Sequence, residues 1–176
     1  MARYRSELME KEHDDAQHHR YLTFWVEKEI FGVDLLQVSE ILEMRPITEL
    51  PETPDFIRGM IKLRSQMIPV IDLRIKFAKK SAQYDDRTCI VVVKTKEITV
   101  GLIVDRVLDA ITILPEDIVP PPQYGVDGQS QYISGVAKSK EQISILLCSE
   151  RLFREDEMSN IKNICMSGER DEYEAV

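Results

Sequence analysis

The sequence predicts a mainly β fold in which two small antiparallel barrels pack together. Short apolar runs alternate with polar turns at close intervals through the central part of the chain, which is typical of antiparallel strands. The pattern also repeats, because the two halves of the chain contain matching segments in the same order. A chain of 176 residues with 43% hydrophobic residues can bury a core, and two packed barrels avoid the weakness of a core of ~60 residues.

The first elements are a leader, a hairpin and a short helix. Residues 1–20 are rich in charge and carry almost no periodic apolar pattern, so we expect a disordered leader. The fold should begin at Tyr21, where YLTFWV and IFGVDL flank the polar EKE and predict a hairpin. LLQVSEILEM (35–44) has apolar residues at helical spacing and favours a short helix, and the proline-rich RPITELPETPD predicts a connector.

The next elements are further hairpins and a last helix. GMIKLRSQMIPVIDL (59–73) predicts two strands with Lys62 and Arg64 facing outward and with Pro69 at an edge or a bulge. CIVVV, ITVGLIVDRVLDAITIL and QYISGVAKSKEQISILL supply the remaining strands, and LPEDIVPPPQYGVDGQSQ predicts a long loop. Segment 154–176 has apolar residues at every third position, which predicts a short docked helix followed by a loose acidic tail.

An internal repeat relates the two halves. FGVDLLQV aligns with VGLIVDRV, and FIRGMIK aligns with YISGVAK. Gly32 therefore matches Gly101, and Gly59 matches Gly135, which indicates that the same barrel corner or bulge leaves no room for a Cβ in both halves. We expect one domain over 21–153, composed of two barrels with the repeat interleaved.

Composition and motifs argue against catalysis and against nucleic-acid binding. The chain has 31 acidic and 23 basic residues, and the resulting net charge of −8 repels phosphate backbones. It has no glycine-rich phosphate loop, its three histidines lie in the leader, and its three cysteines have no C-x-x-C spacing. We therefore expect no enzymatic activity, no metal and no cofactor. No signal peptide or long apolar segment is present, so we expect a cytoplasmic protein without direct membrane insertion.

Lys62 and Arg64 leave two interpretations open. The pair is either the solvated face of a hairpin or part of a docking surface for a partner. The second interpretation has support because an arginine beside apolar positions such as Leu35, Val38 or Met67 is typical of a protein interface. Sequence physics alone does not separate the two.

Four runs resemble the CheW family of bacterial chemotaxis coupling proteins: FGVDLLQVSEI, PDFIRGMIKLRSQMIPVIDLRIKF, YDDRTCIVVV and TVGLIVDRVLDAI. The resemblance covers about residues 21–153, in order and with few gaps. It implies two small SH3-like five-stranded β-barrels packed together. It also implies a non-enzymatic adaptor that couples the cytoplasmic tips of transmembrane chemoreceptors to the regulatory domain of the histidine kinase CheA, in receptor arrays reached through its partners.

The resemblance also assigns docking residues. Gly59 matches a family glycine associated with kinase docking, and Arg64 matches the arginine of the family's N-L-R-G turn, in which Lys62 and Ser65 replace the Asn and the Gly. If this turn requires a positive φ at Ser65, the serine is strained and Arg64 points differently from the family pattern. The expected kinase-binding residues are Gly59 and Arg64. The expected receptor-binding residues are Leu35, Val38, Glu40, Gly101 and Val107.

Two other functions stay open at this level. One is a CheW-like adaptor in a chemosensory pathway that controls an output other than flagella, such as surface motility. The other is a small-barrel nucleic-acid-binding protein, which the net charge and the lack of a basic aromatic strand face disfavour.

Overall fold

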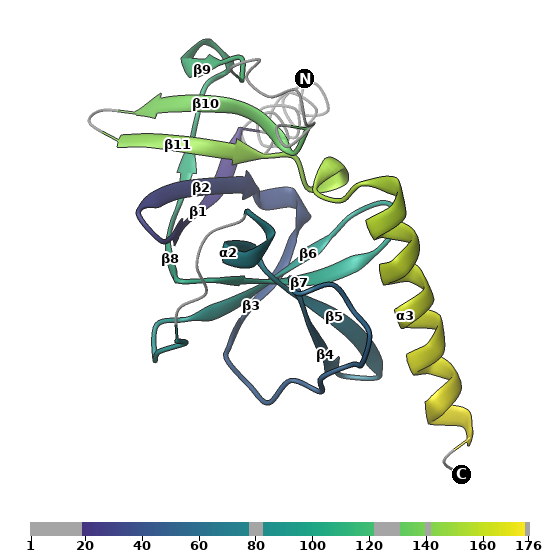
Figure 1. The fold of residues 1–176 in the computed structure, drawn as a ribbon. Helices are drawn as coiled ribbons and strands as arrows, with labels where there is room; N and C mark the ends of the chain where they lie inside the picture. The colour runs from purple at the N-terminus through teal and green to yellow at the C-terminus, as the bar shows by residue number, and fades with distance from the viewer. Residues whose placement is uncertain (1–18, 78–82, 122–130, 140–141, 175–176) are drawn as a thin grey trace, which may run out of the picture.

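The computed structural model describes residues 19–77, 83–121, 131–139 and 142–174, with side chains as far as Cys165 (Figure 1). These residues form one β-sheet of six strands and one of five, with a few short helices and a longer C-terminal helix. The prediction of a mainly β fold with a C-terminal helix is confirmed. Figure 1 shows the six-stranded sheet, which we call sheet A, above the five-stranded sheet B.

Sheet A has the strand order β8-β1-β2-β11-β10-β9. Its strands are β1 (Arg20–Val26), β2 (Glu29–Asp34), β8 (Arg106–Thr112), β9 (Ile118–Val119), β10 (Ile133–Ser139) and β11 (Gln142–Leu147). Sheet B has the order β3-β6-β7-β5-β4. Its strands are β3 (Val38–Glu43), β4 (Ile57–Leu63), β5 (Gln66–Asp72), β6 (Cys89–Lys94) and β7 (Thr99–Val104). The helices are η1 (Leu35–Gln37), α2 (Leu73–Lys76), η2 (Pro115–Asp117), η3 (Ser149–Arg151) and α3 (Glu155–Glu174).

Each sheet takes strands from both halves of the sequence. Sheet B holds β3 to β7, whereas sheet A joins the first hairpin, β1–β2, to β8 to β11. The two halves meet in each sheet through a parallel pair, β2 with β11 in sheet A and β5 with β7 in sheet B. The chain passes from sheet A to sheet B through η1, and it returns through one residue, Asp105, between β7 and β8. We call these two links the crossings.

Both sheets curl on themselves. In each, the chain that leaves one edge strand continues to the opposite edge strand. In sheet B, Thr48 follows the edge strand β3 and exchanges backbone hydrogen bonds of 2.9 Å with Met60 on the opposite edge strand, β4. In sheet A, β8 at one edge continues through η2 into β9 at the other. This arrangement is that of a small barrel. Sheet A has six strands instead of the expected five because the two-residue β9 forms a separate strand.

The main core lies where the two sheets meet. It includes Phe24 and Phe31 from sheet A, Val91 and Leu102 from sheet B, and Ile161 from α3, all buried. Each barrel also has a smaller cluster of its own. Burial of apolar surface shared by both sheets and by α3 unites the elements into one folded body.

Two local predictions are wrong. The helix expected over 35–44 is instead the single turn η1 followed by strand β3, because the backbone groups of this run pair with the buried strand β6. This pairing outweighs the helical spacing, and Leu42 is the one apolar residue of the run that is fully buried. Pro69 lies neither in an edge strand nor at the bulge itself, because the register shift of the β4–β5 ladder falls between Ile57 and Gly59. It faces Met60 within β5, just before the ladder with β7 begins.

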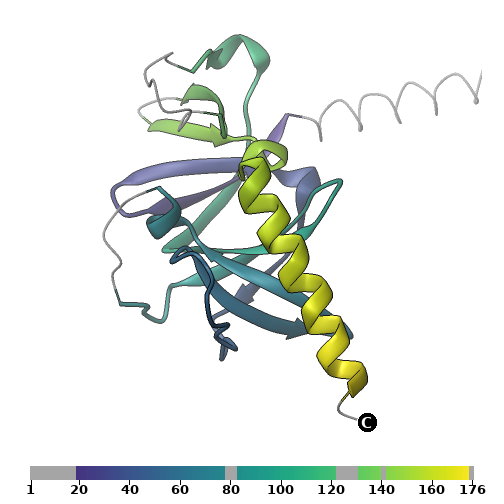
Figure 2. The ribbon, with the colours of Figure 1, turned by 45° about the vertical axis from the view of Figure 1, so that its right-hand side comes forward.

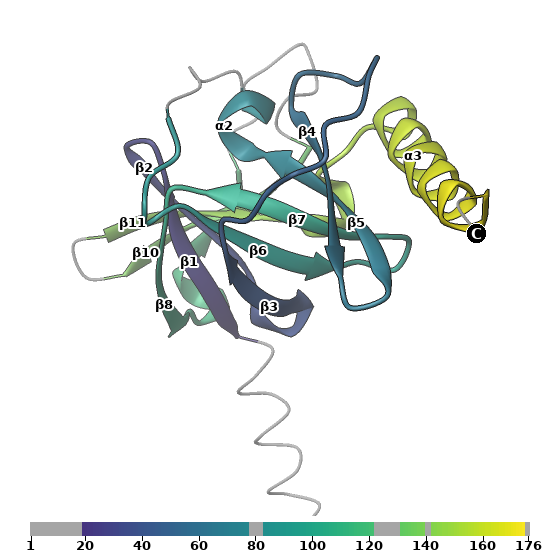
Figure 3. The same ribbon diagram turned by 90° about the horizontal axis from the view of Figure 1, so that it is seen from below.

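The C-terminal helix is longer than the short helix expected. It spans Glu155–Glu174, buries Ile161 completely and packs Met158 against the main core. Figures 2 and 3 show it descending along one side of sheet B, where it contacts β5. Among the helices of the described ranges, none combines the length and the apolar character needed to cross a membrane.

Candidate functional site

Arg64 is the first of the two central residues in the turn between β4 and β5. It has a φ of 59°, whereas Ser65 is not among the described residues with positive φ. Positive φ at the first central position alone is the pattern of a type II′ hairpin turn. The condition under which Ser65 would be strained is therefore not met, and the residue in the left-handed region is Arg64 itself.

Arg64 forms an ion pair across the line where the two edges of the curled sheet B, β3 and the β4–β5 hairpin, meet. We call this line the seam. Its Nη2 lies 3.4 Å from Oε2 of Glu40 on β3, and the exposed fractions of the two side chains are 83% and 26%. Since β3 and the β4–β5 hairpin lie at opposite edges of the sheet, the pair forms only when the barrel closes. An ion pair this exposed contributes at most about 1 kcal/mol, so Arg64 can exchange Glu40 for another acceptor at little cost.

Three of the candidate residues share one row across sheet B. Glu40 pairs with Val92, Val92 with Gly101, Gly101 with Val70, and Val70 with Gly59. A register shift lies beside each end of this row, next to Glu40 and next to Gly59. β-Bulges with glycines bend a strand sharply, so the row marks a corner of the barrel.

The two glycines of this row act through backbone shape. Gly59 is buried with a φ of 144°, and a Cβ there would overlap the carbonyl oxygen of Thr48. A Cβ on Gly101, which is also buried, would lie 2.7 Å from Cγ2 of Ile90. Neither residue offers a side chain to a partner, so any contribution to docking comes from the surface that each allows its neighbours to form.

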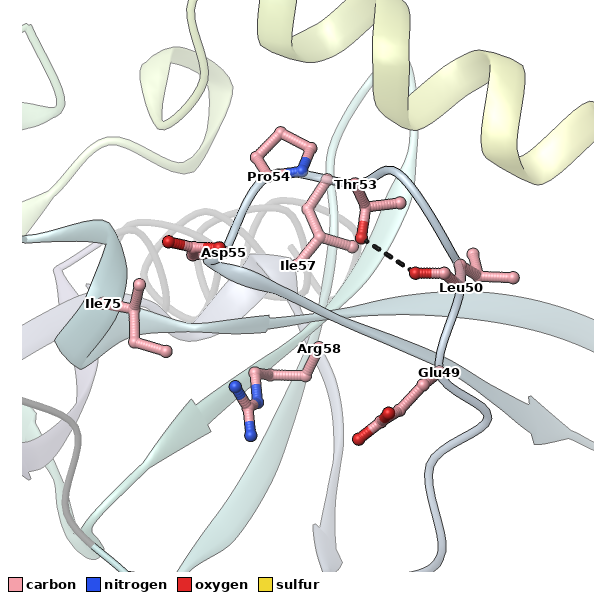
Figure 4. Close-up of a pocket in the computed structure, with 8 residues that line it drawn as sticks. All are labelled: Glu49, Leu50, Thr53, Pro54, Asp55, Ile57, Arg58 and Ile75. Carbon is pink, nitrogen blue, oxygen red and sulfur yellow. Dashed lines mark hydrogen bonds between the residues drawn. The ribbon is translucent and has the colours of Figure 1, made fainter.

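A cleft of about 560 Å³ lies next to Gly59 (Figure 4). In Figure 4, Arg58 on β4 reaches out between the carboxylates of Asp55 and Glu49. Thr53 Oγ1 donates a 3.3 Å hydrogen bond to the carbonyl of Leu50 and so fixes the bend of the connector. The lining alternates charges of both signs with apolar groups, which suits a protein surface better than a phosphate. It comprises Glu49, Leu50, Thr53, Pro54, Asp55, Ile57, Arg58 and Ile75.

The remaining receptor candidates flank the two crossings. Leu35 begins η1 and Val38 follows it, whereas Val107 lies two residues beyond Asp105. All three are half-buried and pack against the main core. Sites distant in the sequence therefore lie at the two points where the chain changes sheets.

Sequence reasoning missed two exposed residues of this region. Leu36 in η1 and Ile41 on the edge strand β3 are 48% and 46% exposed, so both present apolar side chains to the solvent beside the candidate residues. The helical interpretation of this run placed Ile41 on a buried face. The alternation in VSEILE would have found it, because successive residues of a strand face opposite sides and Ile41 therefore faces away from its buried neighbour Leu42.

Nothing in the described part of the chain points to a reactive centre. No group of three His, Cys, Asp or Glu residues there is placed to hold a metal ion. Cys89 and Cys148 are free thiols, and both are half-buried, as is Cys165. Burial raises the pKa of the Cys89 thiol, which disfavours the reactive thiolate.

Known proteins resemble this chain in sequence and in fold. The protein family described as the CheW-like domain matches residues 20–157. The chain is 35% identical over 147 residues to chemotaxis protein CheW of Klebsiella aerogenes, covering 84% of this chain and 89% of that protein. It is also 35% identical over 124 residues to protein FrzA of Myxococcus xanthus, covering 69% and 77%. The crystal structure of scaffolding protein TtCheW from Thermoanaerobacter tengcongensis has a TM-score of 0.73 at 33% identity, covering 79% of this chain and 94% of that one. The resemblance seen in the sequence is confirmed, and the chain belongs to the CheW-like domain family.

Proposed function

We propose that this chain is a non-enzymatic adaptor of chemotaxis signalling that couples chemoreceptors to the histidine kinase CheA, in the cytoplasm at receptor arrays. Its family membership makes it a chemotaxis scaffold. The observation that carries the coupling is the Arg64–Glu40 ion pair. It brings the side chain expected to face the kinase within 3.4 Å of one expected to face the receptor.

The ion pair can be formed or broken, and the binding of either partner can favour one of these two states. Coupling requires that one partner change the affinity of the other, which happens only when the contacts differ between two states of the adaptor. Here one state has Arg64 on Glu40, and the other has Arg64 on an acceptor of the partner. Because the pair is exposed on the Arg64 side, we expect a coupling free energy on the order of 1 kcal/mol.

On the kinase side, we place docking at the cleft beside Gly59. Gly59 lets the connector lie directly on β4, since the Thr48 carbonyl occupies the space that a side chain would take. Arg58, Asp55 and Glu49 give this face charges of both signs around apolar groups. A polar rim around an apolar centre is the usual anatomy of a protein interface.

On the receptor side, we place docking along η1 and β3 and on the neighbouring β8. Leu36 and Ile41 expose apolar surface there, and Leu35, Val38 and Val107 are half-buried beside the crossings. Glu40 adds a charge at the edge of this surface and connects it to Arg64. The two docking surfaces therefore meet at the seam of sheet B.

Charge reversal tests the proposal. We expect Arg64→Glu and Glu40→Arg each to weaken ternary assembly with a receptor cytoplasmic fragment and CheA by about tenfold, because each juxtaposes like charges at the seam. The melting temperature should stay close to that of the wild type, since the pair is exposed. The double variant restores the pair with reversed sign and should recover part of the assembly.

The matched control is the exposed pair Lys162–Glu97, with an N···O distance of 3.2 Å and exposed fractions of 45% and 54%. Reversing the charge of Lys162 should leave ternary assembly with the receptor fragment and CheA unchanged. Co-sedimentation of both seam variants at wild-type levels would refute the role of the pair, and loss of assembly together with a lowered melting temperature would indicate a structural role instead.

A further inference from the structure

The one-turn helix α2 leaves sheet B at the end of β5 and reaches the crossing at Asp105. Nε of Arg74 lies 2.5 Å from Oδ1 of Asp105, and only 16% and 18% of the two side chains are exposed. The other carboxylate oxygen of Asp105 accepts the backbone N–H of Glu27, in the β1–β2 turn of sheet A, at 2.5 Å. One carboxylate therefore contacts both α2, which follows sheet B, and the β1–β2 turn of sheet A.

The start of α2 is fixed by a buried carboxylate. Asp72 is 1% exposed and accepts the backbone N–H of Arg74 at 2.9 Å, which caps the helix. The hydroxyl of Tyr84 donates to the same carboxylate at 2.6 Å. Burial and this hydrogen bond raise the pKa of Tyr84, so the donor stays protonated at neutral pH. The backbone that carries Arg74 is thus held in place independently of Asp105.

The end of α2 contacts three further parts of the chain, which are α3, β2 and the residue before β10. Lys76 Nζ lies 2.7 and 2.8 Å from the two oxygens of Glu157 on α3, with 11% and 6% of the side chains exposed. The ring of Phe77 stacks on those of Phe31 in β2, at 5.0 Å between centroids, and of Tyr132 before β10, at 4.9 Å. The ion pair is largely buried and the rings of Phe77 and Tyr132 are partly buried, so these contacts hold the end of α2 in place.

We propose that Arg74 is a positioning residue for the Asp105 crossing, and that its contact with Asp105 sets where β8 lies relative to sheet B. The crossing is a single residue, so its backbone angles determine the direction in which the chain enters sheet A. From a fixed base on α2, Arg74 holds the carboxylate of that residue. Without Arg74, the crossing and the β1–β2 turn bonded to it open locally, while both sheets stay folded.

Two backbone N–H groups report on this opening directly. The N–H of Glu27 donates to the Asp105 carboxylate, and the N–H of Asp105 donates to the carbonyl of Trp25 at 3.0 Å. Both bonds join β1 or its turn to the crossing, whereas Val92 and Leu102 lie in the buried centre of sheet B. Local and global opening therefore expose different amides to exchange.

Hydrogen exchange of the free chain, measured by NMR on Arg74→Met, tests the proposal. We expect the amides of Glu27 and Asp105 to exchange at least about tenfold faster than in the wild type, with Val92 and Leu102 unchanged within about twofold. Arg74→Lys keeps the positive charge and should restore part of the protection. Lys162→Met, which breaks an exposed ion pair with Glu97 away from the crossing, should alter neither pair of amides.

Two results would overturn the assignment. Unchanged exchange at Glu27 and Asp105 would show that Arg74 does not hold the crossing, and equal acceleration throughout both sheets would show that it acts only on global stability. If Arg74→Met does not fold, Asp105→Asn serves as the second variant, because it keeps an acceptor for Glu27 and removes the charge that Arg74 meets. The measurement involves no partner, so it is independent of the proposed docking function.

Discussion

Gly59 and Arg64 were both assigned to kinase docking, but they can serve a partner only in different ways. Arg64 is a side chain at the surface, whereas Gly59 is a buried backbone position. A docking defect in a variant of Arg64 therefore tests a contact. A docking defect in a variant of Gly59 tests the shape of the connector that lies on it.

We expect Gly59→Ala to lower the free energy of unfolding by about 1–3 kcal/mol, because it forces a side chain into a φ of 144° and onto the Thr48 carbonyl. Urea denaturation followed by circular dichroism measures the change. Gly135→Ala, at the matching place in the repeat, is the control. Its Cβ would first meet the side chain of Ile118, at 2.5 Å, which can move, so we expect a smaller loss.

An equal decrease in the free energy of unfolding for Gly59→Ala and Gly135→Ala would contradict the special strain at Gly59. For the same reason, Gly59→Asp should weaken both folding and kinase binding. Its use as a docking probe requires a comparison at a temperature where the variant is fully folded.

The sequence predicts an exposed Arg64 from strand alternation, and the side chain is exposed, although the residue lies in the β4–β5 turn and not on the strand. The ion-pair partner of Arg64 could not be predicted from the sequence. Glu40 lies far from Arg64 in the sequence and meets it only because the edges of sheet B close on each other. The same closure hides Gly59 behind Thr48, which no local pattern reveals.

At the scale of elements, run 35–44 shows how a strand overrides helical spacing. Its apolar residues fit a helix, yet the partner strand β6 is fully buried from Ile90 to Val93 and needs backbone hydrogen bonds from a neighbour. The requirement comes from β6 rather than from the run itself. The local sequence therefore could not decide between helix and strand.

The ion pair between Lys76 of α2 and Glu157 of α3 leads to a prediction for two variants. We expect Lys76→Met to lower the free energy of unfolding by about 3–5 kcal/mol, because it leaves the buried Glu157 carboxylate without its main cation. Adding Glu157→Leu removes the buried carboxylate, which then has only Arg154 Nε at 3.2 Å as its cation among the described residues, and should recover much of the loss. Thermal and urea unfolding of the two variants measure both effects. A double variant no more stable than Lys76→Met would contradict this account of the pair.

At the scale of the whole molecule, the sequence predicted two barrels and a repeat but not which strands pair between the halves. The parallel pairs of β2 with β11 and of β5 with β7 join strands that are distant in the sequence and differ little in pattern from their neighbours. Short apolar runs specify that strands form. The register between distant strands depends on how the whole core packs.

The shared core predicts one cooperative unfolding transition for both barrels, because buried residues of sheet A, sheet B and α3 form a single cluster. Trp25 is the only tryptophan and lies in β1, so its fluorescence reports on sheet A. Far-ultraviolet circular dichroism reports on both sheets. We expect the two signals to give the same midpoint in urea, and a second transition seen by only one of them would show that the barrels unfold separately.

Sheet A joins the first hairpin, β1–β2, to the strands β8 to β11, and this has a consequence for synthesis on the ribosome. Sheet B is formed by one continuous stretch, β3 to β7, so it can close while the rest of the chain is still being made. The first hairpin emerges earlier, but its partner β11 is among the last strands translated. During that interval β2 presents an unpaired, apolar edge, so we expect the nascent chain to be most prone to aggregate through the β1–β2 hairpin.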